Sequence, residues 1–371
     1  MSKLQVAIVA PSLGILGGQA VQADRLLRAW RDDPDVEAWL VPVNPAPPRL
    51  LGFTARVKYL RTLVTELTYV PRLVRELTRA DVVHVFSASY VSFLLAPLPA
   101  ILAARALGRP VVLNYRSGEA PDHLKRSAIA RAALARVDRN VVPSRFLAEV
   151  FASFGIDATI VPNIVDLDCF RYREREVLRP RLLSTRNFEP LYNVACTLRA
   201  FRVVQDRWPE AALTLVGGGS EEAALRALAG ELGVKHVTFT GRVDPGEIAA
   251  CYASHDIYIQ SPNIDNMPTS VLEAYASGLP VVSTEAGGMP AILTSGEHGL
   301  LAPVNDHQSL AMHVLSLLDN PALARRLTQA AYRACQECTW PRVRRQWLHL
   351  YRSVRPSAAG HAAAAITHDR A

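Results

Sequence analysis

The chain has 371 residues, too many for one ordinary hydrophobic core, so we expect two domains. Half of the residues are hydrophobic and a fifth are charged, a composition that excludes a disordered or fibrous protein. The net charge of +7 favours a partner that carries phosphate, such as a nucleotide, a lipid headgroup or a nucleic acid, but does not choose among them.

Predicted strands alternate with predicted helices through the first half of the chain. Short runs rich in valine and isoleucine are separated by longer amphipathic stretches, the pattern of βα units around a parallel sheet. The strands that this pattern predicts are residues 5–10, 36–43, 81–87, 110–116, 140–143 and 158–162. The pattern breaks in a polar segment with a Pro-Asn turn signal at residues 162–179. There we place the boundary between a first domain, residues 1–165, and a second, residues 166–339.

A second series of predicted strands follows the boundary. It comprises residues 181–185, 212–216, 237–240, 257–260, 280–283 and 299–302, again separated by helical stretches. The predicted fold class is therefore α/β, with two facing Rossmann-like domains. Ligands of open parallel sheets bind beyond the carboxyl ends of the strands, so we expect one deep cleft between the domains. The alanine-rich residues 357–371 lack periodicity and are predicted to form a disordered tail.

Three features bear on where the protein works. The apolar run near the amino terminus is not followed by a small-residue cleavage pattern, so we predict a strand there and no signal peptide. The longest apolar stretch, residues 91–104, is shorter than a membrane span and contains two prolines, which argues against a transmembrane helix. Five cysteines without disulfide spacing indicate reduced thiols, and we expect a cytoplasmic protein.

A basic stretch at residues 56–79 has two interpretations. It contains six basic and two acidic residues among leucines and valines. Such a helix can lie on an anionic membrane surface, which would make the protein peripheral on the inner face of the cell membrane. It can also pack its apolar side on the first sheet and leave its charges in solvent, and this is the interpretation that we favour.

The most informative segment is residues 257–290, IYIQSPNIDNMPTSVLEAYASGLPVVSTEAGGMP, which predicts a strand, a loop, a helix, a strand and a Gly-Gly loop. Pro268 suits the first turn of the helix, Asp265 and Asn266 its cap, and Gly278 its end. A helix start offers free N–H groups to a diphosphate. Glu273, further along the helix, can accept hydrogen bonds from hydroxyls. The alternative is an ordinary capped helix with one exposed glutamate.

This segment and four others resemble the fourth family of retaining glycosyltransferases, also described as glycosyl transferases group 1. The others are VAIVAPSLGILGGQAVQA, STRNFEPLYNVACTLRAF, LTLVGGGSEE and VTFTGRVDPGEIAACYASHDIYIQSP, in the order and spacing of the family. The resemblance implies the GT-B architecture, in which two Rossmann-like domains face each other across a cleft. It also implies that a last helix, residues 340–356, crosses back and completes the first domain.

The resemblance implies a retaining hexosyltransferase of polysaccharide or glycoconjugate biosynthesis. The donor would be a nucleotide-diphosphate sugar, with a UDP sugar favoured, and the acceptor a hydroxyl of a glycan, a lipid-linked molecule or a small molecule. No cofactor and no metal ion are expected, because fixed positive groups can stabilise the leaving diphosphate. The sequence does not indicate the sugar, the linkage or the pathway.

Two carboxylates bracket the donor in this family, the first in contact with the transferred sugar and the second with the ribose hydroxyls. Glu273 matches the second, and Asp265 occupies the first position with a shorter side chain. Pro268 replaces a usual glycine and removes one backbone N–H donor. The neighbouring residues that are expected to bind the donor are Asn266, Met267, Thr269 and Ser270.

Three further positions bear on charge in the cleft. The family carries an arginine and a lysine, five residues apart, that offset the charge of the diphosphate. Arg186 matches the arginine, but Leu191 stands in place of the lysine. Arg116 stands where many members carry a histidine that faces the cleft, and its guanidinium is predicted to supply positive charge there. The predicted catalytic residues are therefore Arg186, Asp265 and Arg116.

Glycine loops complete the predicted donor site. Gly17 and Gly18 follow the first strand and would let the backbone approach a ligand, although a tight strand-to-helix turn explains them equally well. For the second domain, the resemblance adds the following donor-binding residues: Gly217, Gly218, Arg242, Val243, Gly287 and Gly288.

Other functions receive less support from the sequence. No cluster of histidines and carboxylates has metal-ligand spacing, and Cys335 with Cys338 lacks the second pair of ligands that zinc needs. The arginines are dispersed without a reading motif, so no nucleic-acid partner is expected. Two alternatives remain on the same fold. One is a non-catalytic nucleotide-sugar-binding protein, which the departures from the family pattern keep open, and the other is a sugar-nucleotide 2-epimerase.

Overall fold

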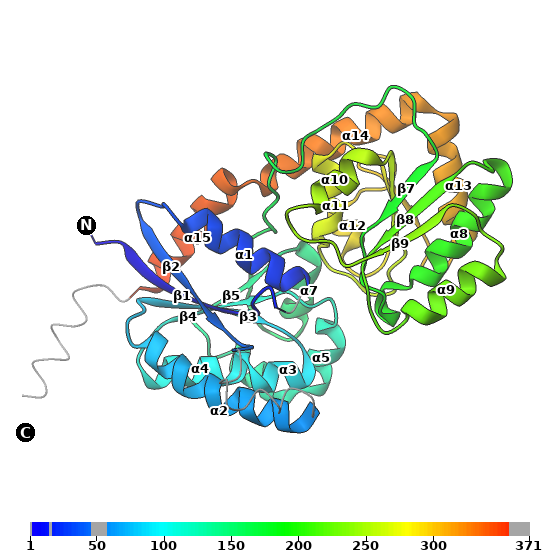
Figure 1. The fold of residues 1–371 in the computed structure, drawn as a ribbon. Helices are drawn as coiled ribbons and strands as arrows, with labels where there is room; N and C mark the ends of the chain where they lie inside the picture. The colour runs from blue at the N-terminus through cyan, green and yellow to red at the C-terminus, as the bar shows by residue number, and fades with distance from the viewer. Residues whose placement is uncertain (1, 15–16, 46–57, 356–371) are drawn as a thin grey trace, which may run out of the picture.

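The computed structural model describes residues 2–14, 17–45 and 58–355, which form two lobes side by side (Figure 1). Each lobe is built on one six-stranded sheet in which neighbouring strands are parallel. The predicted α/β class, with one parallel sheet in each half of the chain, is confirmed. The predicted disordered tail, residues 357–371, lies outside the described residues.

The first lobe surrounds a sheet with the strand order β2-β1-β3-β4-β5-β6. Its strands are β1 (Leu4–Ala10), β2 (Val36–Pro42), β3 (Val82–Ser87), β4 (Val111–Tyr115), β5 (Arg139–Val142) and β6 (Thr159–Ile160). Its helices are α1 (Gly18–Trp30), α2 (Lys58–Leu77), α3 (Tyr90–Leu95), α4 (Pro97–Ala106), α5 (Ala120–Arg126), α6 (Ala128–Leu134) and α7 (Arg145–Ser153). Because all strands run the same way, their carboxyl ends lie at one end of the sheet.

Alternate residues of the first-lobe strands face opposite layers of helices, as the pleat of a strand requires. Ala7 and Val9 of β1 share a buried cluster with residues of α2, α4 and α7, whereas Val6 and Ile8 share another with residues of α1 and of the C-terminal helix. Figure 1 shows α2, α3 and α4 on one face of this sheet and α1 on the other.

The C-terminal helix α15 (Trp340–Val354) runs from the second lobe back onto the first (Figure 1). Trp347, Leu348 and Tyr351 form its apolar face and are buried in the first-lobe core. Arg344 on the same helix forms ion pairs with Asp33 at 2.5 Å and with Asp35 at 2.7 Å. Both ends of the chain therefore contribute to the first lobe.

The second lobe surrounds a sheet with the strand order β12-β11-β10-β7-β8-β9. Its strands are β7 (Arg181–Ser184), β8 (Ala212–Val216), β9 (Val237–Gly241), β10 (Ile257–Ile259), β11 (Val281–Thr284) and β12 (Leu300–Ala302). Its helices are α8 (Val194–Arg207), α9 (Glu222–Glu231), α10 (Ile248–Ser254), α11 (Thr269–Ala276), α12 (Met289–Ile292), α13 (His307–Asp319) and α14 (Pro321–Cys335), with the 3-10 turns η2 (Pro190–Tyr192) and η3 (Gln336–Cys338).

One predicted strand is much shorter in the structure. Residues 158–162 were expected to be extended, but β6 comprises only Thr159 and Ile160 at the edge of the first sheet. Both residues are exposed, and Pro162 has no N–H with which to continue the ladder. The edge strand therefore ends before the linker between the lobes.

Helix α2 contains most of the basic stretch, of which residues 56 and 57 lie outside the described part. Tyr69, Leu73 and Leu77 are fully buried in the first-lobe core, while Arg72 and Arg75 are exposed. This end of the helix packs as the solvent-facing interpretation predicts. Within residues 2–14, 17–45 and 58–355, no helix combines the length and the apolar character that a membrane crossing needs.

Candidate functional site

A cavity of about 950 Å³ opens between the two lobes. Its wall is formed by residues that follow β1 and β4 in the first lobe and β7, β8, β9 and β10 in the second. These are carboxyl ends of parallel strands, where α/β proteins bind their ligands. The volume lies in the range of small-molecule sites, roughly 300–1,000 Å³.

Most of the residues predicted from sequence line this cavity. They are Gly17, Gly18, Arg116, Arg186, Gly217, Arg242, Val243, Asp265, Asn266, Met267, Thr269, Ser270 and Glu273. Gly17 and Gly18 leave space, since no described atom lies within 4 Å of where a Cβ of either would be. A ligand could therefore approach the backbone at the start of α1.

Three predicted donor-binding glycines, Gly218, Gly287 and Gly288, do not line the cavity as the described residues form it. A Cβ at Gly287 would lie 2.3 Å from the Asp265 carbonyl oxygen, and one at Gly288 would lie 2.5 Å from that of Asn266. The Gly288 N–H also donates to the Asp265 carbonyl at 3.0 Å. The Gly-Gly pair thus supports the cavity loop from behind, and direct contact with a ligand stays a prediction.

The start of helix α11 (Thr269–Ala276) differs from the prediction. Pro268 is its N-cap residue, with an extended backbone at φ −65° and ψ 127°, so the placement of this proline in the first turn is wrong. Asp265 and Asn266 consequently belong to the loop before the cap. The fixed φ of proline suits both the N-cap and the first turn of a helix, so the sequence alone did not distinguish these two positions. Gly278, at φ +70°, follows the helix end as predicted.

Arg186 and Asp265 form a buried ion pair beside the start of α11. Arg186 Nη2 lies 2.6 Å from Asp265 Oδ2, Nη1 donates to Ser270 Oγ at 3.2 Å, and the guanidinium lies 4.0 Å from the centre of the Tyr192 ring. Burial raises the pKa of Asp265, an effect that Arg186 opposes. Burial disfavours the charge of Arg186, but the Asp265 carboxylate and the neighbouring tyrosines together raise its pKa. Arg186 therefore keeps its charge next to the helix start.

Glu273 is held from both lobes. Its Oε1 accepts from Arg25 Nη2 at 2.5 Å, across the cavity from α1, and its Oε2 accepts from the Tyr252 hydroxyl at 2.9 Å. The side chains of Arg25 and Glu273 are only 15% and 9% exposed. The carboxylate predicted to bind ribose is thus already ion-paired.

Residues of the first lobe also hold the loop before α11. Ser144 Oγ is hydrogen-bonded to Asn266 Oδ1, and Asn163 Nδ2 donates to the Met267 carbonyl at 2.6 Å. Gln22 Nε2 donates to Thr269 Oγ1 at 3.4 Å. Sequence reasoning missed these contacts together with Arg25. The sequence signal that could have found Gln22 and Arg25 is their spacing. They lie three residues apart on one face of α1, one turn beyond the glycine pair that was predicted to approach the ligand.

Two glycines allow the loops to approach closely. A Cβ at Gly118 would lie 3.0 Å from the Asp265 carbonyl carbon, so the loop after β4 meets the loop before α11 backbone to backbone. Gly217 has φ +148°, and a Cβ there would lie 2.3 Å from the Arg186 carbonyl oxygen. Glycine is required at Gly217 both by its conformation and by this contact.

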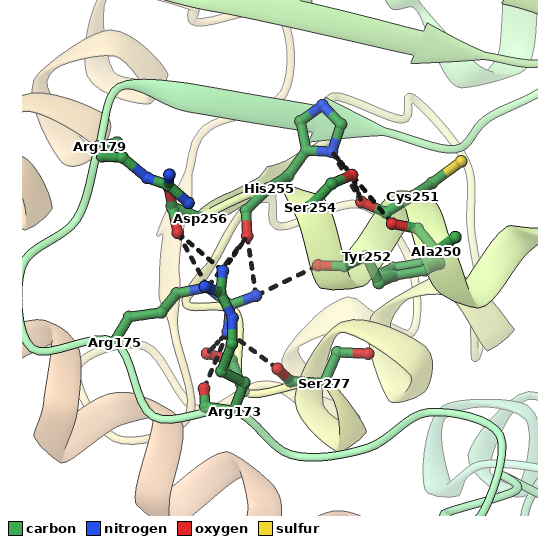
Figure 2. A network of polar contacts seen from close by, with 11 residues as sticks. Arg173, Arg175, Arg179, Ala250, Cys251, Tyr252, Ser254, His255, Asp256 and Ser277 are labelled. Atoms are coloured by element: carbon green, nitrogen blue, oxygen red, sulfur yellow. Dashed lines mark hydrogen bonds and ion pairs between the residues drawn. The ribbon is translucent and has the colours of Figure 1, made fainter.

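A network behind the cavity fixes α11 at its other end (Figure 2). The Arg175 guanidinium donates to the carbonyls of Ser277 and Gly278, each at 2.9 Å, and to that of Tyr252 at 3.2 Å. Its Nε lies 3.1 Å from Asp256 Oδ1. A cation at these carbonyls satisfies the C-terminal groups of α10 and α11. The two helices that carry Tyr252 and Glu273 are thereby held together.

Several buried polar atoms in residues that line the cavity have no hydrogen-bond partner in the described part of the chain. They are Arg116 Nη2, Asn163 Oδ1, Arg186 Nε and Asn266 Nδ2. Since almost all buried polar groups in proteins are hydrogen-bonded, these atoms mark where a polar ligand or water would bind. Across residues 2–14, 17–45 and 58–355, no group of three or more His, Cys, Asp or Glu could hold a metal ion.

Comparison with known proteins agrees with this geometry. The model described as Glycosyltransferase Family 4 matches residues 16–169, and that described as Glycosyl transferases group 1 matches residues 173–334. The chain is 31% identical to the GDP-mannose-dependent alpha-(1-6)-phosphatidylinositol monomannoside mannosyltransferase of Mycolicibacterium smegmatis, over 71% of this chain and 74% of that protein. The chain belongs to this glycosyltransferase family. The resemblance found in the sequence motifs is confirmed.

Another relative and two solved structures extend the comparison. Phosphatidyl-myo-inositol mannosyltransferase of Mycobacterium leprae is 33% identical over 56% of this chain, which spans 56% of that relative's length. HepE of Anabaena, solved with UDP and glucose, has a TM-score of 0.75 and 16% identity over 94% of this chain and all of HepE. Sucrose-phosphate synthase of Thermosynechococcus elongatus has a TM-score of 0.70 and 18% identity over 95% of this chain and 99% of its own. These likenesses confirm the GT-B fold.

The position of the family's lysine has a distinct structure in this glycosyltransferase chain. Leu191 lines the cavity, and its carbonyl accepts the N–H of Asn263 at 2.8 Å. Its backbone therefore joins the loop after Arg186 to the loop before α11. Its side chain brings no charge to the cavity, whereas Arg186 does.

Proposed function

We propose that this protein transfers a sugar from a nucleotide-diphosphate sugar to an acceptor hydroxyl, with retention of configuration and without a metal ion. The observation that carries the proposal is the convergence of Arg186, Gly217 and the start of α11 on one cavity wall, with Glu273 one to two turns along the helix. A cation, a glycine loop and a helix start suit a diphosphate, and a carboxylate suits ribose hydroxyls. Family membership supports the same assignment.

The proposed reaction needs no protein nucleophile. The bond between the anomeric carbon and the diphosphate oxygen breaks, and the electron pair leaves with the diphosphate. Arg186 and the N–H groups of α11 stabilise the charge that develops there. The acceptor oxygen bonds to the anomeric carbon from the same side, which retains the configuration, and its proton passes to the departing diphosphate. Asp265, placed beside Arg186, is proposed to contact the transferred sugar.

The names of the similar proteins mention two different nucleotides. HepE was solved with UDP and glucose, whereas the relative from Mycolicibacterium smegmatis is named for GDP-mannose. The sequence resemblance favours UDP, and this preference stays a prediction. Relatives named for phosphatidylinositol acceptors support a lipid-linked acceptor among those that the resemblance implies.

Titration of the purified protein with UDP, GDP and ADP in EDTA tests the donor site. We expect one nucleotide to bind with an affinity that added magnesium leaves unchanged, because the proposed phosphate ligands are all protein groups. Isothermal calorimetry measures both affinities. Binding that requires magnesium would contradict the metal-free site, and no binding by a folded sample would contradict the donor site itself. The matching nucleotide sugar is then assayed for hydrolysis and transfer.

The alternatives on the same fold predict different results in that assay. A non-catalytic nucleotide-sugar-binding protein would bind the sugar nucleotide without hydrolysis or transfer to any of several acceptors. A 2-epimerase would change the sugar without needing an acceptor. Transfer to an acceptor hydroxyl with an unchanged anomeric configuration, seen by proton NMR, distinguishes the proposed function from both.

Peripheral contact with an anionic membrane is proposed for the exposed side of α2. Arg72 and Arg75 are exposed there together with Val70 and Val74, while Tyr69, Leu73 and Leu77 are buried. We therefore expect weak pelleting with phosphatidylglycerol vesicles at low salt that disappears at moderate salt, since contact through charge alone is screened. Phosphatidylcholine vesicles serve as the control. Pelleting that persists at moderate salt, or none at low salt, would be incompatible with a purely electrostatic contact.

A further inference from the structure

Arg116 is a cation without a carboxylate partner among the described residues. It follows β4 in the first lobe and lines the cavity. Its Nη1 donates to Asn114 Oδ1 at 3.2 Å, whereas its buried Nη2 has no hydrogen-bond partner in the same part of the chain. Leaving a buried donor of a charged group unsatisfied is costly. The position is therefore built for an acceptor that the protein does not supply.

A chain of buried hydrogen bonds sets the direction of this guanidinium. Asn114 Nδ2 lies 3.1 Å from His84 Nε2, and His84 Nδ1 lies 2.7 Å from the Tyr351 hydroxyl on α15. Burial, with a smaller effect of Arg116, lowers the pKa of His84 to about 3, so the imidazole is neutral and Nε2 can accept from Asn114. The amide oxygen of Asn114 then points to Arg116. The returning helix α15 thus helps to hold a cation in the cavity wall.

The charge of Arg116 persists although the side chain is partly buried. Burial lowers its pKa to about 9, which leaves it protonated at neutral pH. The guanidinium carbon lies 5.4 Å from the centre of the Phe86 ring, an apolar neighbour that does not neutralise it. A cation with little solvent around it attracts an anion more strongly than an exposed one does.

Arg116 and Arg186 occupy different settings. Arg186 belongs to the second lobe, beside the start of α11, and Asp265 balances its charge. Arg116 belongs to the first lobe and is followed directly by the loop from Ser117 to Glu119, which also lines the cavity. The leaving diphosphate already has a cation and a helix start on the second lobe. A second cation from the other lobe, with an unpaired donor, suits a different anion.

We propose that Arg116 binds an oxyanion, a phosphate or a carboxylate, that belongs to a substrate but is not the leaving diphosphate. The oxyanion is carried either by the acceptor or by the transferred sugar, and Arg116 selects the substrate that carries it. This inference rests on the proposed function. The inference requires that either the acceptor or the transferred sugar carries an anionic group in addition to the diphosphate.

The first measurement separates Arg116 from the diphosphate site. The nucleotide that binds the wild type is titrated into Arg116→Gln and into Arg145→Gln, a control that removes one charge from an 81% exposed side chain of the same lobe. We expect both variants to bind the nucleotide within about twofold of the wild type, since Arg116 would not touch the diphosphate. A loss of about tenfold or more in Arg116→Gln alone would place it at the diphosphate and overturn the proposal.

The second measurement tests, in two separate titrations, whether the acceptor or the donor sugar carries the oxyanion. In the acceptor arm, protein saturated with the nucleotide is titrated with myo-inositol 1-phosphate and with myo-inositol. In the donor arm, the protein is titrated with the glucuronate and the glucose form of the same sugar nucleotide. In one arm we expect the wild type to bind the charged probe at least about tenfold more tightly than the neutral one, the gain of a charge-assisted hydrogen bond. Arg145→Gln should keep this preference.

The variants then decide whether Arg116 causes the preference. Arg116→Gln should abolish it, and Arg116→Lys should keep part of it, because lysine supplies the charge without the two-nitrogen geometry. A preference that survives Arg116→Gln would overturn the proposal. So would nucleotide binding without a charge preference in either arm of the wild type, a result that does not depend on the variants folding. Failure of every nucleotide to bind would instead overturn the proposed function, and this inference with it.

Discussion

Replacing Arg186 by glutamine should lower donor turnover by about 10²–10³-fold, the loss seen when one preorganised group is removed from a developing charge. The side chain is 9% exposed and directed by Asp265 and Ser270 at the start of α11. Leu191 stands at the family's lysine position, so no ammonium group there can replace the lost charge. We therefore expect the loss in kcat at saturating donor, measured as nucleotide release.

Controls for this experiment separate catalysis from folding. Arg186→Gln leaves Asp265 buried without its partner, which destabilises the fold, whereas the double variant Arg186→Gln/Asp265→Asn removes both charges. The double variant should regain thermal stability without regaining turnover. Arg186→Lys should retain part of the turnover, because it keeps the charge but loses the forked geometry. Wild-type turnover in a folded Arg186→Gln sample would exclude Arg186 from the transition state.

The positions of the strands could be predicted because buried parallel strands are short apolar runs, and such runs need no knowledge of their neighbours. The strand order could not, since the pairing of β1 with both β2 and β3 depends on crossovers that leave no local pattern. The edge strand β6 shows the same limit. Its apolar residues predicted a longer strand, but only one neighbour was present to pair with it.

The cavity wall was predicted best where a local motif determines it. The segment around α11 carries its own strand, loop, helix and glycine signals, and its loop and helix residues line the cavity as expected, although Gly287 and Gly288 do not. Gln22, Arg25 and Ser144 were missed because they reach that segment from the other lobe, and polar residues on helix surfaces are usually solvent-exposed. Pairing Arg25 with Glu273 requires knowing how the two lobes face each other, which no single motif specifies.

Replacing Glu273 by glutamine should weaken nucleotide binding by about 10–100-fold, the effect of losing a charged acceptor for ribose hydroxyls. The change is isosteric and keeps an oxygen that can accept from Tyr252, so α10 and α11 should stay together. Calorimetry measures the affinity, and Glu149→Gln, at a 71% exposed position, is the matched control. Unchanged affinity in the Glu273 variant would remove this carboxylate from the ribose site.

The ion pair between Arg25 and Glu273 leads to a prediction of the opposite sign for nucleotide affinity. Because Arg25 Nη2 already lies 2.5 Å from Glu273 Oε1, ribose must displace or share this guanidinium. Arg25→Gln should therefore tighten nucleotide binding severalfold, roughly the worth of one partly buried ion pair. If Arg25 acts only through the carboxylate, its replacement should have no effect in the Glu273→Gln background, since a double-mutant cycle isolates their coupling. Weaker binding in Arg25→Gln would mean instead that Arg25 itself contacts the nucleotide. Both lobes would then bind the ligand, and Arg25 would not compete with the ribose for Glu273.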